Sequence, residues 1–361
     1  MEIVKWWTGL AIMLGQKISR RGEKMVTKKK IGLSIFIALF LLSGIGAGPV
    51  AGKELKLILA DYLPPSYDDY FPANQIFVDY VNKHGRGIVQ IDFFHSGKLL
   101  QAKELMPGLL QGTADIIVDT DSYVMGTAPI LGILELPFLY KDEFDFSKKT
   151  RIGTPLFNLI NQELAKQNLI ILSSCASTPE HIWSVKKPIK RVEDLKGLRI
   201  RTAGRVEAEV IKALGAASTT LPSAEVYEAL KRGTIDASLH YLGTVPGRSL
   251  QEVYKFVTLG YWASYGRQPY MRLDRWKALP QEIKDVLIAA GKAMEDEGFK
   301  TLVKVHNEKY WPLVRKAGIQ IIEPAPEEAK RFKEACLPVW DWWKKQVPAD
   351  VAAKAIELAT K

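Results

Sequence analysis

The sequence has few of the groups that enzymes place at metal centres or use as nucleophiles. It contains five histidines and two cysteines in 361 residues. No two histidines have the spacing of a metal site, and no H-E-x-x-H or C-x-x-C motif occurs. The G-x-S-x-G nucleophile elbow and the Walker A loop are also missing. We therefore predict no enzymatic activity, no cofactor and no metal; an exported enzyme on a two-lobed scaffold is the alternative.

The N-terminal region differs in composition from the rest of the chain. Three lysines at 28–30 precede an apolar run at 31–45, and small residues fill most of 46–52. This succession is typical of a secretory signal peptide. We therefore predict a signal peptide over 25–52 and a periplasmic mature protein.

Met25 stands directly before this segment and is a natural start. Residues 1–24 are then a mis-called extension, and cleavage is expected near Gly52. The alternative is an uncleaved N-terminal anchor, although the apolar run is short for a span of ~20 residues.

Without this N-terminal region, the basic residues of the chain outnumber the acidic residues only slightly. The whole chain has 50 Lys and Arg against 40 Asp and Glu, a net charge of +10. Residues 1–52 hold eight of the basic and two of the acidic residues, so 42 and 38 remain. This mild excess, without a basic stripe interleaved with aromatic residues, predicts no nucleic-acid partner.

The two cysteines, Cys175 and Cys336, lie far apart in the sequence. An exported protein can form a disulfide. Cys175 ends an apolar strand-like run and Cys336 sits in a helical pattern, so we favour buried free thiols.

Runs of apolar residues alternate with amphipathic segments along the chain. A helix is expected from Pro72 to Gly85 and another around 101–111, and "SAEVYEALKRG" predicts a helix with Ser223 as its N-cap. Long helices are expected at 281–310, 326–346 and 349–359. Strands are predicted at 55–60, 88–94, 114–119, 168–174, 181–185, 199–202 and 234–241. The alternation indicates an α/β fold with mainly parallel sheets flanked by helices.

An internal similarity indicates two lobes. "ELMPGLLQGTAD" from Glu104 and "EVYEALKRGTID" from Glu225 share Leu, Gly-Thr and Asp at equal offsets. Each copy predicts a helix, a glycine stop and a buried strand. We predict lobe I over 53–178 and 266–305 and lobe II over 179–265 and 306–361, with crossing segments near 175–180 and 262–267 and C-terminal helices spanning both lobes. Ligands of such folds bind at the carboxyl ends of the strands.

The segment "GLRIRT" at 197–202 predicts a strand with Arg199 and Arg201 on one face. Arg201 is nearer the carboxyl end. A guanidinium meets a carboxylate with two parallel hydrogen bonds and stays charged, so Arg201 is a candidate anion site.

The sequence around these arginines resembles that of a known family. The run "DLKGLRIRTAGRVEAEVIKALGAASTTLPSAEVYEALKRGTIDAS", with "HSGKLLQAKELMPGLLQGTADI", "LELPFLY" and "WKALPQEIKDVL", is similar to the DctP-type solute-binding subunits of TRAP (tripartite ATP-independent periplasmic) transporters. The resemblance covers roughly 53–345. It implies a monomer of the periplasmic binding protein fold that captures an organic acid between its lobes. The acid then passes to a small and a large membrane subunit for ion-gradient-driven uptake. An ABC-type or sensor-linked binding protein is the remaining alternative.

The resemblance also implies the site residues. The second arginine of the strand, Arg201, is at the position of the family's carboxylate clamp. His181 and His240 stand where many relatives have an arginine and a ligand or metal-binding residue, so a metal-bridged ligand is not expected. The complete predicted ligand set is Arg201, His240, Tyr241, His181, Thr120 and Tyr62.

Overall fold

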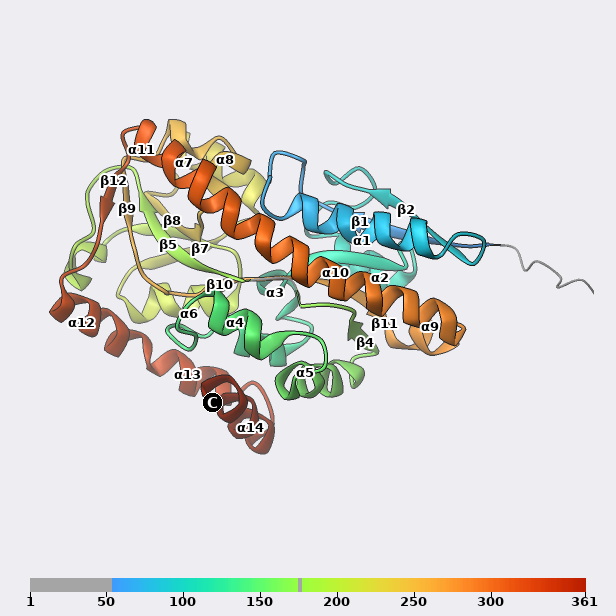
Figure 1. Cartoon of the computed structure of the whole chain (residues 1–361). Helices are drawn as coiled ribbons and strands as arrows, with labels where there is room; N and C mark the ends of the chain where they lie inside the picture. The colour runs from blue at the N-terminus through green and yellow to red at the C-terminus, as the bar shows by residue number, and fades with distance from the viewer. Residues whose placement is uncertain (1–53, 175–176) are drawn as a thin grey trace, which may run out of the picture. The chain divides into compact units, whose positions relative to one another are not determined.

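The structure is a computed structural model that describes residues 54–174 and 177–361 (Figure 1). These residues belong to one structural unit, Gly52–Lys361. The predicted signal peptide, the extension before it and Cys175 fall outside the described residues.

The first sheet, with its helices, forms lobe I. Its strand order is β2-β1-β3-β11-β4, and β1 pairs in parallel with β2 and β3. The strands are β1 (Leu55–Asp61), β2 (Val89–Phe94), β3 (Ile116–Thr120), β4 (Leu169–Ile171) and β11 (Arg267–Arg272). The helices are α1 (Phe71–His84), α2 (Leu105–Gln111), α3 (Asp121–Val124), the 3-10 helix η1 (Pro129–Leu134), α4 (Glu143–Thr150), α5 (Pro155–Ala165) and α9 (Leu273–Ala278).

The second sheet forms lobe II in the same way. Its strand order is β12-β9-β5-β8-β6-β7, and β10 pairs with β5. The strands are β5 (Thr178–Ser184), β6 (Arg199–Thr202), β7 (Ala217–Thr220), β8 (Ala237–Tyr241), β9 (Phe256–Thr258), β10 (Ser264–Tyr265) and β12 (Gln320–Ile322). The helices are η2 (Val192–Leu195), α6 (Arg205–Ala213), η3 (Ser223–Glu225), α7 (Val226–Lys231), α8 (Thr244–Gly247), η4 (Leu250–Glu252) and α11 (Trp311–Lys316).

The chain passes between the two sheets three times: directly from β4 to β5 and from β10 to β11, and through long helices from β11 to β12. Every antiparallel pair within 54–174 and 177–361 involves β5 or β11, the strands that follow the two direct crossings. The strand β12, which follows the helical crossing, pairs in parallel with β9. The two sheets are therefore mixed, because a strand that arrives directly from the other lobe lacks the helical crossover that makes neighbouring strands parallel.

The long helix α10 (Gln281–Val305) runs along α1 and continues into a π-helical turn, η5 (His306–Tyr310), and α11 (Figure 1). A small residue allows the close approach of the two helices, because a Cβ at Gly298 would lie 2.8 Å from the Cβ of Ala73. The helical segment expected at 281–310 is thus confirmed. None of the helices in the described part of the chain combines the length and apolar character that a membrane crossing requires.

The C-terminal helices α12 (Pro326–Cys336), α13 (Pro338–Lys344) and α14 (Ala349–Thr360) contact both lobes. Trp343 on α13 is buried and donates from Nε1 to the carbonyl of Pro129 in lobe I at 2.9 Å. The guanidinium of Arg205 in lobe II lies 5.7 Å from the ring centre of Trp342. The tryptophans thus pack a helix across the lobes, as expected; losing one buried Trp side chain typically costs ~3–5 kcal/mol.

Three local expectations differ from the structure. The helix expected from about 101 begins at Leu105, and the one expected at 326–346 is divided before Pro338, whose missing N–H cannot continue the helical ladder. Ser223 caps no helix with its side chain. Its Oγ accepts instead from Arg248, and its N–H donates to the hydroxyl of Tyr123 at 3.0 Å.

Cys336 is free and buried, and burial raises its thiol pKa to about 12.

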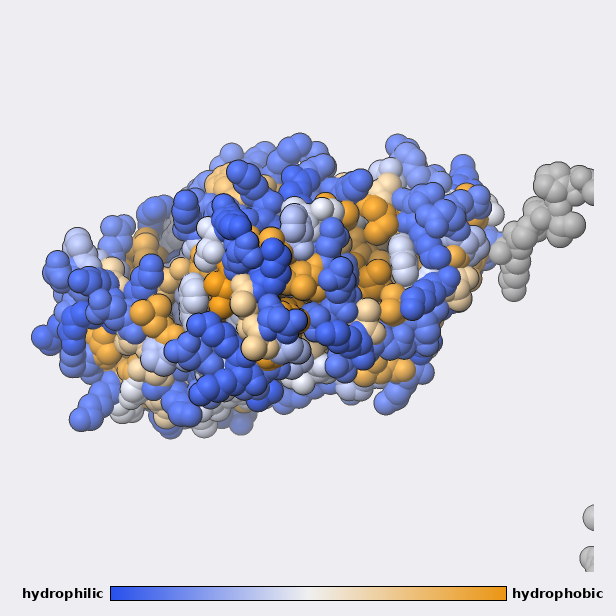
Figure 2. All heavy atoms as spheres, turned by 90° about the horizontal axis from the view of Figure 1, so that it is seen from below, coloured by the Kyte–Doolittle hydropathy of each residue, from blue (hydrophilic) through white to orange (hydrophobic). Residues whose placement is uncertain are grey.

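Charged and polar side chains cover most of the face seen in Figure 2, with apolar residues visible between them.

Inside lobe I, however, one ion pair is fully buried. Arg267 on β11 bonds Asp61 at the end of β1, and both side chains have 0 % exposure. The same guanidinium donates to the carbonyl of Val118 at 2.7 Å. This pair therefore ties three strands together at the carboxyl end of the sheet.

Removing Arg267 should destabilise the protein strongly. Arg267→Met leaves Asp61 as an uncompensated buried charge, for which a loss of ~3–5 kcal/mol in the free energy of unfolding is expected. The matched control is Arg272→Met on the same strand, whose pairing with Asp274 is partly exposed and should contribute less than ~1 kcal/mol. Denaturant unfolding of both variants measures the difference; equal losses would contradict this role of the buried pair.

Candidate functional site

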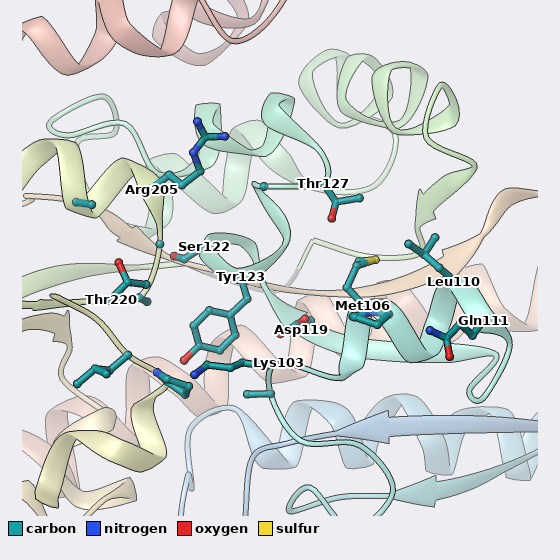
Figure 3. Close-up of a pocket in the computed structure, with 18 residues that line it drawn as sticks. Lys103, Met106, Leu110, Gln111, Asp119, Ser122, Tyr123, Thr127, Arg205 and Thr220 are labelled. Carbon is teal, nitrogen blue, oxygen red and sulfur yellow. The ribbon is translucent and has the colours of Figure 1, made fainter. Parts of the chain in front are cut away.

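A pocket of about 670 Å³ opens between the lobes (Figure 3). Met106 and Leu110 of α2 and Tyr123 of α3 line it from lobe I. Gly204 and Leu221 line it from lobe II. Its volume is in the range of ~300–1,000 Å³ that holds small-molecule ligands. The pocket lies where α3 follows β3, at the strand ends predicted to bind a ligand.

Arg201 does not line this pocket; it is 2 % exposed and bonds the backbone of Leu221, which does. Its Nε donates to the carbonyl of Leu221 at 2.8 Å, and its Nη1 donates to the carbonyl of Leu239 at 3.2 Å. These two bonds hold the plane of the guanidinium. Within the described residues, Nη2 has no hydrogen-bond partner, and no carboxylate lies within ion-pair distance of the side chain.

Two other arginines of this region are paired with acids, whereas Arg248 donates to Ser223 Oγ and lies 5.3 Å from the ring centre of Tyr67. Arg267 is equally buried but has Asp61 as its counter-ion. Arg199 is on the same strand as Arg201, with 46 % of its side chain exposed, and it binds Asp236 through Nε at 3.0 Å. Hydrogen bonding to Arg199 lowers the pKa of the Asp236 carboxyl. Arg201 therefore differs from both: a buried cation is costly unless an anion or hydrogen bonds compensate it.

Tyr123 connects Arg201 to the pocket. Its ring lines the pocket and lies 5.6 Å from the ring of Tyr62. Burial raises the pKa of the Tyr123 hydroxyl, and the nearby Arg201 guanidinium partly offsets this. The sequence reasoning did not single out Tyr123, although its position just after Asp121 at the end of a buried strand could have suggested it.

Tyr62 and Thr120, both predicted as ligand residues, are in direct contact. The Tyr62 hydroxyl and the Thr120 Oγ1 are 2.8 Å apart, and each lies 3.3 Å from the hydroxyl of Tyr265. Burial raises the pKa of Tyr62 and Tyr265 well above the usual range, so both are neutral hydroxyls. Tyr265 was not predicted; its place in the segment that crosses between the lobes was the available indication.

Tyr241 belongs to the same aromatic cluster. Its ring is stacked on Tyr265 with 4.0 Å between centres and meets Tyr70 edge-on at 5.4 Å. The Tyr241 side chain is completely buried, and its hydroxyl has no hydrogen-bond partner among the described residues. Burial raises its pKa well above the usual value. A buried neutral hydroxyl without a partner can donate to an anion.

His240 packs inside lobe II in the structure, and its role as a ligand residue stays a prediction. Its ring is stacked on Trp183, with 5.4 Å between centres and 8° between planes. Nδ1 lies 2.8 Å from the carbonyl of Tyr241 and Nε2 lies 3.0 Å from the hydroxyl of Tyr254. Both nitrogens are thus engaged, and burial lowers the pKa of His240 to about 3, which keeps it neutral.

His181 is also placed away from the pocket beside Arg201. It lines a separate cavity of about 170 Å³ together with His306 and Trp311. Its Nδ1 lies 3.0 Å from the carbonyl of Gly260. Burial lowers its pKa to about 4. The structure therefore brings Tyr62 and Thr120 into contact and joins Tyr241 to them through Tyr265. Arg201 lies beside Tyr123, and none of the six predicted residues lines the pocket itself.

Buried acidic groups surround the lobe interface. Glu207 of lobe II accepts from the Oγ of Ser122 in lobe I at 3.0 Å. Burial raises the pKa of Glu135, Glu180 and Glu207. In the described ranges, no group of His, Cys, Asp and Glu side chains has an arrangement that could hold a metal ion.

Asp119, which lines the pocket, gives a testable pH dependence. Burial raises its carboxyl pKa to about 8, against ~3.9 in an unfolded chain. Between these values the unfolded chain releases the proton and the folded protein keeps it. Stability should therefore fall as the pH rises through this window, by at most ~1.4 kcal/mol per pH unit, and level off above it.

Asp119→Asn should remove this component, so its free energy of unfolding should rise relative to wild type between pH 5 and pH 8. Asp79→Asn, on the exposed side of α1, is the matched control. Denaturant titrations across this range measure the slopes. Identical slopes for the two variants would show that Asp119 is ionised in the folded protein.

Comparison with known proteins places this site in a family. Residues 60–346 match the family model DctP, described as bacterial extracellular solute-binding protein, family 7. The chain is 25% identical over 319 residues to the 2,3-diketo-L-gulonate-binding periplasmic protein YiaO of Escherichia coli, covering 87% of this chain and 95% of that protein. It is 24% identical over 298 residues to the C4-dicarboxylate-binding periplasmic protein DctP of Rhodobacter capsulatus, covering 79% and 85%.

The fold agrees with solved structures. A TRAP periplasmic solute binding protein from Haemophilus influenzae with bound L-gulonate superposes with a TM-score of 0.77 at 22% identity, over 84% of this chain and 100% of that one. The predicted two-lobed α/β fold is thereby confirmed. Because the family model covers most of the chain, the protein belongs to family 7 of the bacterial extracellular solute-binding proteins, the DctP family of TRAP transporters.

Proposed function

We propose that this protein captures an organic acid outside the cytoplasm and that Arg201 binds the acid's carboxylate. One observation carries the proposal: Arg201 is a buried guanidinium without an acidic partner among the described residues, although Arg199 and Arg267 both have one. A ligand carboxylate would supply the missing charge at Nη2. Charge-assisted hydrogen bonds of this kind contribute ~1.5–3 kcal/mol each.

Hydroxyls of the aromatic cluster that Tyr123 links to Arg201 would complete the anion site. Tyr62 and Thr120 form one side of it, and the unpartnered hydroxyl of Tyr241 belongs to the aromatic cluster that adjoins them. All of these groups can donate a hydrogen bond to a carboxylate oxygen. His240 would support the site only through packing, because both of its ring nitrogens bond the protein itself. His181 uses Nδ1 for the carbonyl of Gly260 and lines a separate cavity.

The relatives support an acid as the ligand, since two of them are named for 2,3-diketo-L-gulonate and for C4-dicarboxylates. We infer that the bound acid passes to a small and a large TRAP membrane subunit, driven by an ion gradient. The role would be that of a binding protein and not of an enzyme. The protein would act as a monomer, without a cofactor.

We further propose that binding closes the two lobes around the acid. Lobe I comprises 53–178 and 266–305 and lobe II comprises 179–265 and 306–361, joined by the crossing segments. Contacts between Ser122 and Glu207 and between Tyr123 and Ser223 bridge the lobes in this structure. Both bonds would therefore belong to the closed state, and they would break when the lobes open by hinge bending.

Substitution of Arg201 tests the proposal. Arg201→Ala should lower the affinity for the ligand by ~2–5 kcal/mol, because a carboxylate in a partly dry site loses its partner. Arg201→Lys should restore little of this, since an ammonium lacks the planar fork. Calorimetry with the acid that co-purifies with the protein, identified by mass spectrometry, gives the affinities.

The matched control is Arg199→Ala on the same strand. It removes an equal charge from an exposed pair, so it should change affinity by less than ~1 kcal/mol. If Arg199→Ala abolishes binding and Arg201→Ala binds normally, the clamp has been assigned to the wrong residue.

Export is the second consequence of the proposal. The lysines at 28–30, the apolar run and the small residues up to Gly52 predict cleavage by a signal peptidase. N-terminal sequencing of periplasmic protein should therefore begin near Gly52 or Lys53. Membrane-bound protein that begins at Met1 or Met25 would contradict it.

A further inference from the structure

The wall of the interlobe pocket is mostly apolar. Met106, Pro107 and Leu110 of α2 line one side, and Leu221 and Pro222 line the other (Figure 3). Leu110 is 43% exposed and is one of the large hydrophobic side chains that the described residues leave open to water. An apolar surface of this kind gains free energy when a ligand removes it from water.

Three of the polar groups that line the pocket already have partners within the protein. Ser122 Oγ donates to Glu207 at 3.0 Å, and the Tyr123 hydroxyl accepts from the Ser223 N–H at 3.0 Å. Thr220 Oγ1 lies 3.2 Å from Thr202 Oγ1. A ligand with many hydroxyls would therefore find these three groups engaged, and each unpaired buried hydroxyl weakens binding.

The charged side chains at the pocket are engaged in the same way. Lys103 pairs with Glu225 at 3.5 Å across the lobes. Arg205 points away from the pocket centre in Figure 3 and lies over the ring of Trp342. Asp119 is buried and accepts from the N–H of Thr120 at 2.8 Å. Lys103 thus already has one carboxylate as its partner.

We infer that the ligand is a monocarboxylate with an apolar body, such as an aromatic, alicyclic or branched aliphatic acid. The carboxylate would bind Arg201 and the body would fill the pocket lined by Met106, Leu110 and Leu221. This inference rests on the proposed function, because Arg201 must be the anion site for the body to reach the pocket. It differs from the sugar acids and dicarboxylates for which the relatives are named.

The test compares acids that share a carboxylate and differ in the body. Phenylacetate, cyclohexanecarboxylate and 4-methylpentanoate are titrated calorimetrically against L-gulonate and succinate, with ligand-free protein prepared by unfolding and refolding. The apolar acids should bind at least ~10-fold more tightly, the difference that one or two methylene groups make in an apolar pocket.

Variants locate the apolar body. Gly126 lines the pocket, and a Cβ there would meet nothing within 4 Å, so Gly126→Leu fills the space without displacing the protein. This variant should weaken the binding of cyclohexanecarboxylate at least ~10-fold and should weaken the binding of acetate less. Leu110→Asn changes an exposed position that tolerates a polar side chain. It should weaken the binding of the apolar acids by a similar factor. Leu337→Asn, at an equally exposed leucine outside the pocket, is the matched control and should leave all affinities unchanged.

The outcomes separate the two proposals. Tightest binding of L-gulonate or succinate, with Arg201→Ala still abolishing it, would overturn the apolar ligand and leave the proposed function intact. Binding of none of these acids, nor of any acid that co-purifies, would overturn the proposed function itself. Unchanged affinities for apolar acids in both Gly126→Leu and Leu110→Asn would place the body outside this pocket.

Discussion

The constraint on which the site depends is the burial of one positive charge. The guanidinium of Arg201 is held behind the pocket by the carbonyls of Leu221 and Leu239, which orient it without neutralising it. Removing an ion from water costs several kcal/mol even after the protein relaxes. Two backbone carbonyls compensate part of this cost. The part of this cost that the carbonyls do not compensate would be recovered when an anion binds Arg201. A binding protein can obtain affinity from a single residue in this way.

The rest of the lobe interface keeps other charges from competing. Burial raises the pKa values of the nearest acids, Glu180 and Glu207, and the charge of Arg201 lowers them. Asp61 is occupied by Arg267. The tyrosines around these groups are neutral donors. Under the proposed function, Arg201 and these hydroxyls together would favour an anion.

Much of this could be predicted from the sequence, because strand periodicity and chain order decide which residues reach a sheet edge. The pattern of Leu198, Ile200 and Thr202 placed Arg201 at the end of its strand, and the apolar run before Thr120 did the same for lobe I. The roles of His240 and His181 could not be predicted. Periodicity assigns a face to a side chain, but whether that face meets the cleft or Trp183 depends on how the helices around α11 pack. The antiparallel crossings of β5 and β11 depend on such contacts as well.

The central claim is that Arg201 lacks a counter-ion because the ligand provides it. A crystal structure of the protein with its co-purified acid tests this directly. The account predicts a carboxylate oxygen at ~2.7–2.9 Å from Nη2 of Arg201, with Nε and Nη1 still bound to the carbonyls of Leu221 and Leu239. A ligand whose acid group lies on other residues, with Nη2 of Arg201 still unpaired, would contradict it.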